Sequence, residues 1–488
     1  MNSLPAVDLT VLGLYLLGTT LMGCWYVRRV SSSEQFMNAG QSLPGWAVGL
    51  SIFGSYVSSI SFLANPGKSY ESNWNSFVFA LSLPVAAWLA NRYFVPFYRA
   101  AGEVSAYHHL EVRFGAWART YAVVCFMLTQ LMRLGTILYL LTLALTPLLG
   151  WPQHVTILIA GLLITLYPFL GGTEAVIWLG VVQAVVLLLG PAVCIVLLLM
   201  GTSGGFNQVL QMGLAENKFS LGSPEFSFGA STFWVVLLYG MVTNLQNFGI
   251  DQAYVQRYIT ARSDSEARRS VWMGALMYIP VAAAFFYIGT ALFVFYRLRP
   301  DLLAPGLKAD AVFPHFITHQ LPPGVAGLVL AAICAAAMDS NLNCCATLYL
   351  CDIHRRYLRP AASEAESILV LRASTLVMGA LSTVAAIAMM SVKSALDAWW
   401  ELAGIFGGGM LGLFLLGMFR PQAGPRAAGA ATICGVATIM WMTLPKLIPG
   451  FPEAWKSPLH PLMVMVVGTG VIVLVGTILS RNSKPGTR

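Results

Sequence analysis

Thirteen long apolar stretches dominate this sequence, and they restrict its fold more than any other feature. A membrane-spanning helix needs about 20 consecutive apolar residues, whereas the strands of a membrane barrel are about 10 residues long and alternate in polarity. Only 10% of the residues are charged, against roughly 25% in soluble domains. The sequence therefore predicts an all-α integral membrane protein with about thirteen transmembrane helices. The predicted segments are 6–27, 43–65, 74–98, 118–148, 153–170, 174–201, 232–250, 271–295, 324–350, 367–391, 396–418, 426–443 and 461–480.

The chain is predicted to form a single transmembrane transporter domain, 1–488, with internal symmetry. Many transporters consist of two inverted repeats, each with a helix that is broken near the middle of the membrane. Two sets of five segments remain when the first is set aside. This division gives an extra helix at 6–27, a first repeat at 43–201, a second repeat at 232–418 and peripheral helices at 426–480.

Polar residues in the first segment of each repeat predict where those two helices are broken. Hydroxyl groups and glycines form helices poorly in the middle of an apolar segment. In the segment 43–65 they are Gly54, Ser55, Ser58, Ser59 and Ser61. In the segment 232–250 they are Gly240, Thr243, Asn244, Gln246 and Asn247.

The distribution of basic residues predicts the orientation. If the N-terminus lies outside, the cytoplasmic segments, including the polar connection 251–270, hold 17 Lys and Arg residues and the outer segments hold 8. The positive-inside rule favours this arrangement, which places the C-terminus in the cytoplasm. The net charge of +8 therefore reflects membrane topology and does not indicate nucleic-acid binding.

Arg133 and Asp339 are the two charged residues that the sequence places at membrane depth in functionally interesting surroundings. An intramembrane Arg is a functional candidate by default, and its planar guanidinium suits a carboxylate. The alternative is a structural Arg that binds carbonyl groups. Asp339, followed by Ser340, lies among Ala and Met residues, so it must be paired, protonated or bound to a cation. It is either a cation ligand or a partner of a helix end or of an Arg such as Arg133.

Other reactive residue types carry less information. No acid–base pair or nucleophile constellation is apparent at membrane depth, so an enzyme is not expected. The histidines lie near segment ends and do not suggest a metal site. Trp399 and Trp400 fit the interfacial belt of aromatic residues.

Four stretches of the chain resemble the sodium/solute symporter family. They read GWAVGLSIFGSYVSSISFLANPGKSY, YPFLGGTEAVIWLGVVQ, DQAYVQRYITARSDSEARRS and GVAGLVLAAICAAAM. The resemblance covers essentially the whole chain, and within the family it is closest to bacterial sialic acid symporters. It implies a five-plus-five inverted-repeat core like that of the amino-acid transporter LeuT, preceded by one extra helix.

The resemblance also implies the site residues and the coupled ion. Substrate contacts would come from Tyr56, Ser58, Ser61, Asn75, Arg133 and Asn247. The Na⁺ site would use the backbone carbonyls of Gly54, Val57 and Ala336 and the side chains of Asp339 and Ser340. This chain departs from the family here, because Asp339 replaces a serine and about three residues are missing after Ser340. A different placement of that gap would put Ala336 and Ala337 at the serine positions and damage the site.

A second sodium site of sialic acid symporters is predicted to be absent. Its carboxylate belongs to a motif W-T-D-V-I-Q, which reads W-L-G-V-V-Q here, so that Gly180 stands where the Asp would be. The serine partners of that Asp fall in the apparent gap.

The sequence as a whole predicts a sodium-coupled symporter that imports a small organic solute by alternating access. The expected solute is an anionic sugar such as sialic acid. The alternatives are a symporter for a neutral sugar or polyol, in which Arg133 is structural, and an uncoupled or sensor homologue. We expect a monomer that sits in the bacterial inner membrane, contacts lipid, Na⁺ and a solute, and binds no nucleic acid.

Overall fold

The structure, a computed structural model, describes residues 5–27, 37, 39–102, 104–337, 341–448 and 450–481. The helices of the first half are α1 Ala6–Val27, α3 Gly45–Tyr56, the π-helix η2 Ile60–Ala64, α4 Asn65–Glu71, the 3-10 helix η3 Trp74–Phe77, α5 Val78–Leu81, α6 Leu83–Leu89, the π-helix η4 Ala90–Phe94, α7 Val95–Ala101, α8 His108–Phe114, α9 Ala116–Leu149, α10 Gln153–Gly201 and α11 Gly205–Ala215. Those of the second half are α12 Phe233–Ile250, α13 Gln252–Ile259, α14 Asp264–Leu298, α15 Ala309–Gln320, α16 Val325–Ala337, α17 Asn341–Leu348, the π-helix η6 Tyr349–Leu358, α18 Glu364–Met389, α19 Ala395–Phe419, α20 Pro425–Leu447 and α21 Met463–Arg481.

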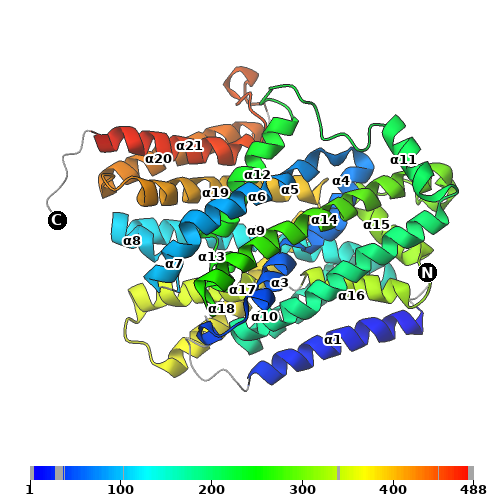
Figure 1. Cartoon of the computed structure of the whole chain (residues 1–488), viewed down its shortest axis with the longest axis horizontal. Coiled ribbons are helices and arrows are strands. Elements are labelled where there is room, and N and C mark those ends of the chain that lie inside the picture. The colour runs from blue at the N-terminus through cyan, green and yellow to red at the C-terminus, as the bar shows by residue number, and fades with distance from the viewer. Residues whose placement is uncertain are drawn as a thin grey trace.

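The all-α prediction is confirmed. Within the described ranges the regular structure is helical, apart from one isolated β-bridge between Leu43 and Ala261. The long helices lie side by side as a bundle, in which α1 begins at one end of the long axis and α21 ends at the other (Figure 1).

The number of membrane spans differs from the prediction. Ten of the described helices are long and apolar enough to cross a membrane, and the bent pair Gly45–Tyr56 and Ile60–Glu71 gives an eleventh. Two shorter apolar helices, Ala6–Met22 and Gln153–Leu166, coincide with the first and fifth predicted segments. Every predicted segment therefore overlaps at least one of the described helices, but the count of thirteen is not confirmed.

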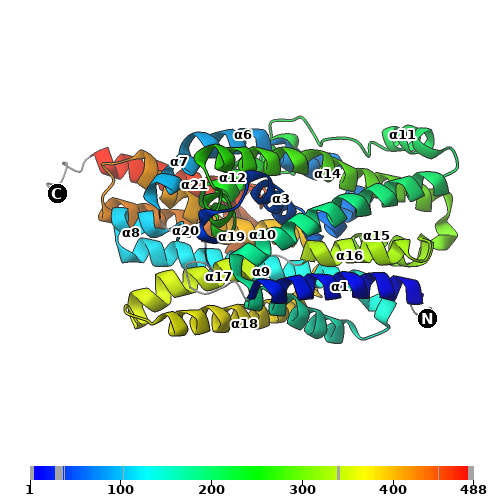
Figure 2. The ribbon, with the colours of Figure 1, turned by 60° about the horizontal axis from the view of Figure 1, so that its bottom comes forward.

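The first and last helices lie at opposite edges of the bundle. Helix α1 packs against α10 and α16, whereas α20 and α21 pack against α19 (Figures 1 and 2). Asp8 attaches α1 to the bundle, because its Oδ1 atom accepts the N–H groups of Gly324 and Gly327 at 2.7 and 2.6 Å. These groups belong to the start of α16, where unpaired N–H groups and the helix dipole favour a carboxylate. The division into two repeats stays a prediction.

The helix that begins at Gly45 is broken after Tyr56, as the serine-rich sequence predicts. Its two halves are bent by 53°. Val57 leaves the helical backbone conformation, with φ −87° and ψ 82°. The Ser58 N–H group then donates to the carbonyl of Tyr56 at 3.2 Å, so the regular helical pattern stops before η2 begins.

The second broken helix is interrupted at a different residue from the predicted ones. Helix α12 runs without a break through the polar residues around Asn244, where the sequence predicts the interruption. The break is at Asp251, which has an extended backbone with φ −73° and ψ 121°. Its Oδ1 atom accepts the N–H of Ala253 at 2.8 Å and so caps α13. A capping carboxylate, not a run of amides, ends the first half of this helix.

Helix α13 also corrects the prediction of a polar inner connection at 251–270. All 8 of its residues are buried. Arg257, which the orientation argument counts as a loop residue, is only 4% exposed. Hydropathy does not detect such a half-helix, because its side chains are polar. They are buried against other parts of the protein, which satisfy their polar groups, and not against lipid.

A short helix outside the candidate spans, α15, fastens the far end of the first broken helix. Asp310 on α15 is buried, and its Oδ2 atom accepts the N–H of Ala395 at the start of α19 at 3.0 Å. Beside it, Lys68 of α4 and Asp397 of α19 form an ion pair at 2.8 Å. Burial raises the pKa of the Asp310 carboxyl to about 6; the Ala395 N–H and Lys68 oppose this shift, whereas Asp397 and Glu71 add to it.

Candidate substrate cavity

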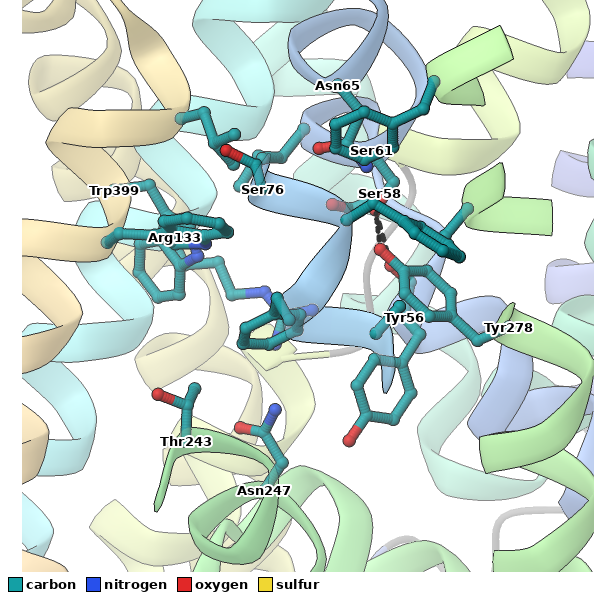
Figure 3. A pocket seen from close by; sticks show the side chains of 18 of the residues that line it. Tyr56, Ser58, Ser61, Asn65, Ser76, Arg133, Thr243, Asn247, Tyr278 and Trp399 are labelled. Atoms are coloured by element: carbon teal, nitrogen blue, oxygen red, sulfur yellow. Dashed lines mark hydrogen bonds between the residues drawn. The ribbon is translucent and has the colours of Figure 1, made fainter. Parts of the chain in front are cut away.

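A cavity of about 690 Å³, counting the part open to solvent, lies beside the break in the first broken helix (Figure 3). Its wall consists mainly of hydroxyl, amide and aromatic groups. The lining residues are Tyr56, Ser58, Ile60, Ser61, Asn65, Ser76, Phe77, Phe79, Ala80, Arg133, Thr243, Asn247, Tyr254, Tyr278, Ala282, Phe286, Leu396, Trp399 and Trp400. Among these described lining residues, Arg133 is the only one with a charged side chain.

Five of the six predicted substrate contacts line this cavity. Their side chains come from the broken helix, from α9 and from α12 (Figure 3). Asn75 is not among them. Its amide donates to the carbonyl of Leu221 at 2.9 Å and accepts from the Ser231 hydroxyl at 2.8 Å, so it fastens the connection between α11 and α12. The neighbouring Ser76 lines the cavity instead, because adjacent residues of η3 point in different directions.

Arg133 lies on α9 and is 8% exposed. Its Nη2 atom donates to the carbonyl of Ser55 at 2.7 Å, one residue before the end of α3. A guanidinium has five N–H donors in a fixed plane, so a bond to a carbonyl can orient the group while other donors meet a ligand. The geometry therefore permits both roles that the sequence suggests, a substrate contact and a structural link.

The hydroxyl of Ser61 is engaged within the protein. It donates to the carbonyl of Tyr56 at 2.8 Å and lies 3.0 Å from the Tyr278 hydroxyl. The Tyr56 ring packs against those of Tyr254 and Tyr278, with centroids 5.1 and 5.2 Å apart. Ser61 thus connects the two sides of the break, and a substrate that reached it would enter an existing hydrogen-bond network.

Several lining residues were missed by the sequence. Tyr254 and Tyr278 stand in segments whose facing direction a single sequence does not reveal. Trp399 and Trp400 were assigned to the membrane interface, but both line the cavity, and Trp400 is only 7% exposed. Aromatic residues at the start of a transmembrane helix can face either lipid or the protein interior, and only the packing of α19 distinguishes the two cases.

The predicted sodium ligands are only partly described. Gly54 lies in the last turn of α3 and Val57 directly follows the end of that helix, and Ser58 N–H donates to Tyr56 instead of to Gly54 four residues before it. Within the described part of the chain, no backbone N–H donates to the carbonyls of Gly54 or Val57, which suits a cation ligand. Ala336 is buried near the end of α16. Asp339 and Ser340 lie outside the described residues, so the site stays a prediction.

Gly180, the position at which the sequence predicts the loss of a second sodium site, packs closely on α3. A Cβ atom added at Gly180 would lie 2.9 Å from Ser51 Oγ. That same Oγ atom accepts a hydrogen bond from the Nε atom of the buried Arg257 at 3.1 Å. A side chain at Gly180 would therefore press on Ser51, which the cationic side chain of Arg257 holds in place.

Comparisons with known proteins agree with this arrangement. The Sodium:solute symporter family matches residues 36–435. The Sodium/sialic acid symporter NanT of Aliivibrio fischeri is 31% identical over 97% of this chain and 93% of its own length. The Sodium/sialic acid symporter SiaT of Proteus mirabilis is 33% identical over 97% and 94%. A solved structure, titled as the substrate-bound outward-open state of a Na⁺-coupled sialic acid symporter that reveals a novel Na⁺-site, superposes with a TM-score of 0.90 at 30% identity over 99% of both chains.

The broken helices and the central cavity define a multi-pass membrane transporter. The chain belongs to the sodium:solute symporter family. It is accordingly a sodium-coupled symporter for a small solute, with the LeuT-like fold that its sequence predicts.

Proposed function

We propose that this symporter imports an anionic sugar of the sialic acid type together with sodium. The observation that carries the proposal is that, among the described residues that line a polar and aromatic cavity, Arg133 is the one permanently charged side chain. Such a wall suits a solute with one carboxylate and several hydroxyl groups. The printed names of NanT and SiaT support the same substrate class.

Each predicted contact then has a separate task. Arg133 binds the carboxylate through its planar fork. Ser58 and Asn247 offer a hydroxyl and an amide to the sugar hydroxyls, and Tyr56 provides an aromatic surface. Ser61 completes the wall through its bond to Tyr56. Asn75 is left out of this proposal, because its side chain is engaged outside the cavity.

Sodium is proposed to bind at the first break. The carbonyl oxygens of Gly54, Val57 and Ala336 and the side chains of Asp339 and Ser340 would form the site. Ion binding would hold the broken helix in the shape that faces the substrate and favour the outward-open state of an alternating-access cycle. By linkage, sodium would raise the affinity for the solute, and the solute would raise the affinity for sodium by the same factor.

One sodium ion per solute is the proposed stoichiometry. A hard cation needs several oxygen ligands. Gly180 supplies no side chain, and the close approach of Ser51 and the guanidinium of Arg257 oppose a second cation nearby. A Hill coefficient for sodium near one supports this stoichiometry, and a value near two contradicts it.

The proposed setting is the inner membrane of a bacterium, with the N-terminus outside, the C-terminus in the cytoplasm and a monomer as the working unit. The opposite positions of the start of α1 and the end of α21 in the bundle support this topology (Figure 1). Accessibility of single cysteines placed in the two terminal helices to a membrane-impermeant reagent tests it.

A neutral sugar or polyol is the second candidate substrate. The bond from Arg133 to the Ser55 carbonyl favours it, because a structural task alone would account for the guanidinium. The two candidates differ in whether the solute must carry a charge.

Uptake into proteoliposomes distinguishes them. The panel consists of sialic acid, its methyl ester, glucose and mannitol, each with sodium, potassium or choline outside. We expect sodium-dependent uptake of sialic acid and little uptake of the methyl ester. Uptake of a neutral solute with no preference for the free acid supports the second candidate, and equal uptake with all three cations contradicts sodium coupling.

A further inference from the structure

One face of α9 contacts both broken helices. Gln130, Arg133 and Ile137 are three and four residues apart, which places them on the same side of a helix. The carbonyl of Ile137 accepts from the Ser59 hydroxyl at 2.8 Å, and Arg133 donates to Ser55 at 2.7 Å. Both contacts belong to the first break. One turn away, Gln130 reaches the second.

The contact of Gln130 is a hydrogen bond to the capping carboxylate. Its Nε2 atom donates to Oδ2 of Asp251 at 3.0 Å, while Oδ1 of Asp251 accepts the N–H of Ala253. A carboxylate can only accept, so the amide nitrogen of Gln130 must face it. Gln130 and Asp251 are 1% and 4% exposed. A buried carboxylate depends on such donors, because leaving it without them is costly.

The position of this bond relative to Arg133 gives it a second consequence. A solute carboxylate that binds Arg133 acts on the face of α9 from which Gln130 bonds to Asp251. Any shift or rotation of α9 that follows solute binding therefore displaces the groups that contact both breaks. A side chain at position 130 that only filled space would form no hydrogen bond to Asp251 and so would not transmit this displacement to α13.

We propose that Gln130 is a positioning residue that couples solute binding at Arg133 to the second broken helix through its hydrogen bond to Asp251. The inference rests on the proposed function, since it takes Arg133 as the solute contact. It predicts that uptake requires one hydrogen-bond donor and one acceptor at positions 130 and 251, and does not depend on which position carries which.

A swap of the pair tests this. In Gln130→Glu two carboxylates face each other, and they must share a proton to remain close. In Gln130→Glu with Asp251→Asn the amide of the new Asn donates to the new Glu, and its oxygen can still accept the Ala253 N–H. Among the described residues, the buried hydroxyl of Tyr107 lies beside Asp251, and Arg133 lies on the next turn of α9; both are present in every variant.

The measurement is sodium-driven uptake of sialic acid at pH 5.5, 6.5 and 7.5, relative to the wild type at each pH. We expect the rate of Gln130→Glu to fall about tenfold or more at pH 7.5 and to recover to within about threefold at pH 5.5. The double variant should recover at every pH, with the interaction shown by a double-mutant cycle. Thr129→Val, which removes only a hydroxyl bonded to its own helix, should leave uptake unchanged.

The outcomes separate this inference from the proposed function. If the wild type transports sialic acid but Gln130→Glu is impaired equally at every pH, or the double variant is no better than the two single losses combined, Gln130 only packs. If the wild type takes up a neutral panel solute and not sialic acid, the proposed function fails, and the same cycle is run on that solute. A flat pH profile there overturns the coupling as well.

Discussion

The two broken helices differ in how the polar groups at their breaks are satisfied. At the first break, between Tyr56 and Ile60, the chain supplies hydroxyl groups and leaves the carbonyls of Gly54 and Val57 without a backbone donor among the described residues. At the second, the carboxylate of Asp251 closes the break by accepting from Ala253 and Gln130. The first break is thus open to ligands, whereas the second is satisfied by the protein itself.

This difference indicates that two broken helices in the same bundle need not have the same task. A break whose polar groups remain available can bind an ion or a solute, and it gains stability when it does so. A break that is capped by the protein depends on those bonds to hold its two half-helices together. Changes at the second break should therefore affect stability as well as the coupling to transport, whereas changes at the first should mainly affect binding.

The largest effect is expected at Asp251. Asp251→Ala removes the cap of α13 and leaves the buried N–H groups of Ala253 and Gln130 without an acceptor. We expect a loss of about 2–4 kcal/mol in stability, from the sum of a cap and an unsatisfied buried donor. Thermal unfolding in detergent measures it.

Ser58→Ala is the matched change at the first break, and it should cost less than about 1 kcal/mol in the same unfolding experiment, as expected for a polar group at a ligand site. Equal losses in the two variants would show that both breaks are structural joints and would remove the contrast.

The next effect concerns binding at the first break. Arg133→Lys keeps the charge but loses the planar fork. Affinity for the acidic solute should fall by about 1–3 kcal/mol, the worth of a hydrogen bond to a charged group. Solute-induced quenching of tryptophan fluorescence reports the affinity, since Trp399 and Trp400 line the cavity. Unchanged affinity in a stable variant would assign Arg133 to the structural role alone.

The far end of the first broken helix carries a pH dependence. Burial raises the pKa of Asp310 to about 6 from its ordinary value of 3.8. The folded state therefore binds more protons than the unfolded state between these values, and stability falls as pH rises from 4 to 6. Between pH 5 and 7 the loss should be about 1.4 kcal/mol, the worth of one pKa unit.

Asp310→Asn tests this dependence, because Asn can still accept the N–H of Ala395 but does not titrate. Its stability should change less than that of the wild type between pH 5 and 7, as measured by thermal unfolding in the same detergent. A variant with the same pH profile as the wild type would show that another group is responsible.

The smallest effect on solute binding is expected at Ser61. Ser61→Ala removes the bond to the Tyr56 carbonyl and the contact with Tyr278, and it should weaken solute binding by about 1 kcal/mol, the value of one neutral hydrogen bond. Ser59→Ala, whose hydroxyl binds Ile137 outside the cavity, provides the control for titration of the solute. A larger effect at Ser59 than at Ser61 would place the binding surface on the other side of the break.

The sequence predicts the first break and the charged residue beside it because their signals are local. Consecutive serines stand out in an apolar segment, and so does an Arg in the middle of one. The predicted position of the second break is wrong because amides such as Asn244 tolerate a helix when their side chains find partners. The Asn244 amide donates to Phe79 and Ser82, which are distant in sequence.

The direction in which side chains point explains the remaining differences between the predicted and the observed site. Asn75 and Ser76 are neighbours, and no pattern in the sequence reveals which of them turns toward the cavity. Trp399 and Trp400 were read as interfacial for the same reason. The sequence predicts a polar loop where α13 lies, because the composition of this segment is that of a loop. The helices that bury α13 lie far along the chain.

The packing of Gly180 against Ser51 restricts how this transporter can change over generations. Any side chain at position 180 meets Ser51, whose hydroxyl also holds Arg257. A single codon change to an acidic residue would therefore disturb α3 before it could attract an ion. Ser51 would have to become smaller and Arg257 would have to turn away first. An acidic residue at position 180 is therefore expected only together with changes at Ser51 and Arg257.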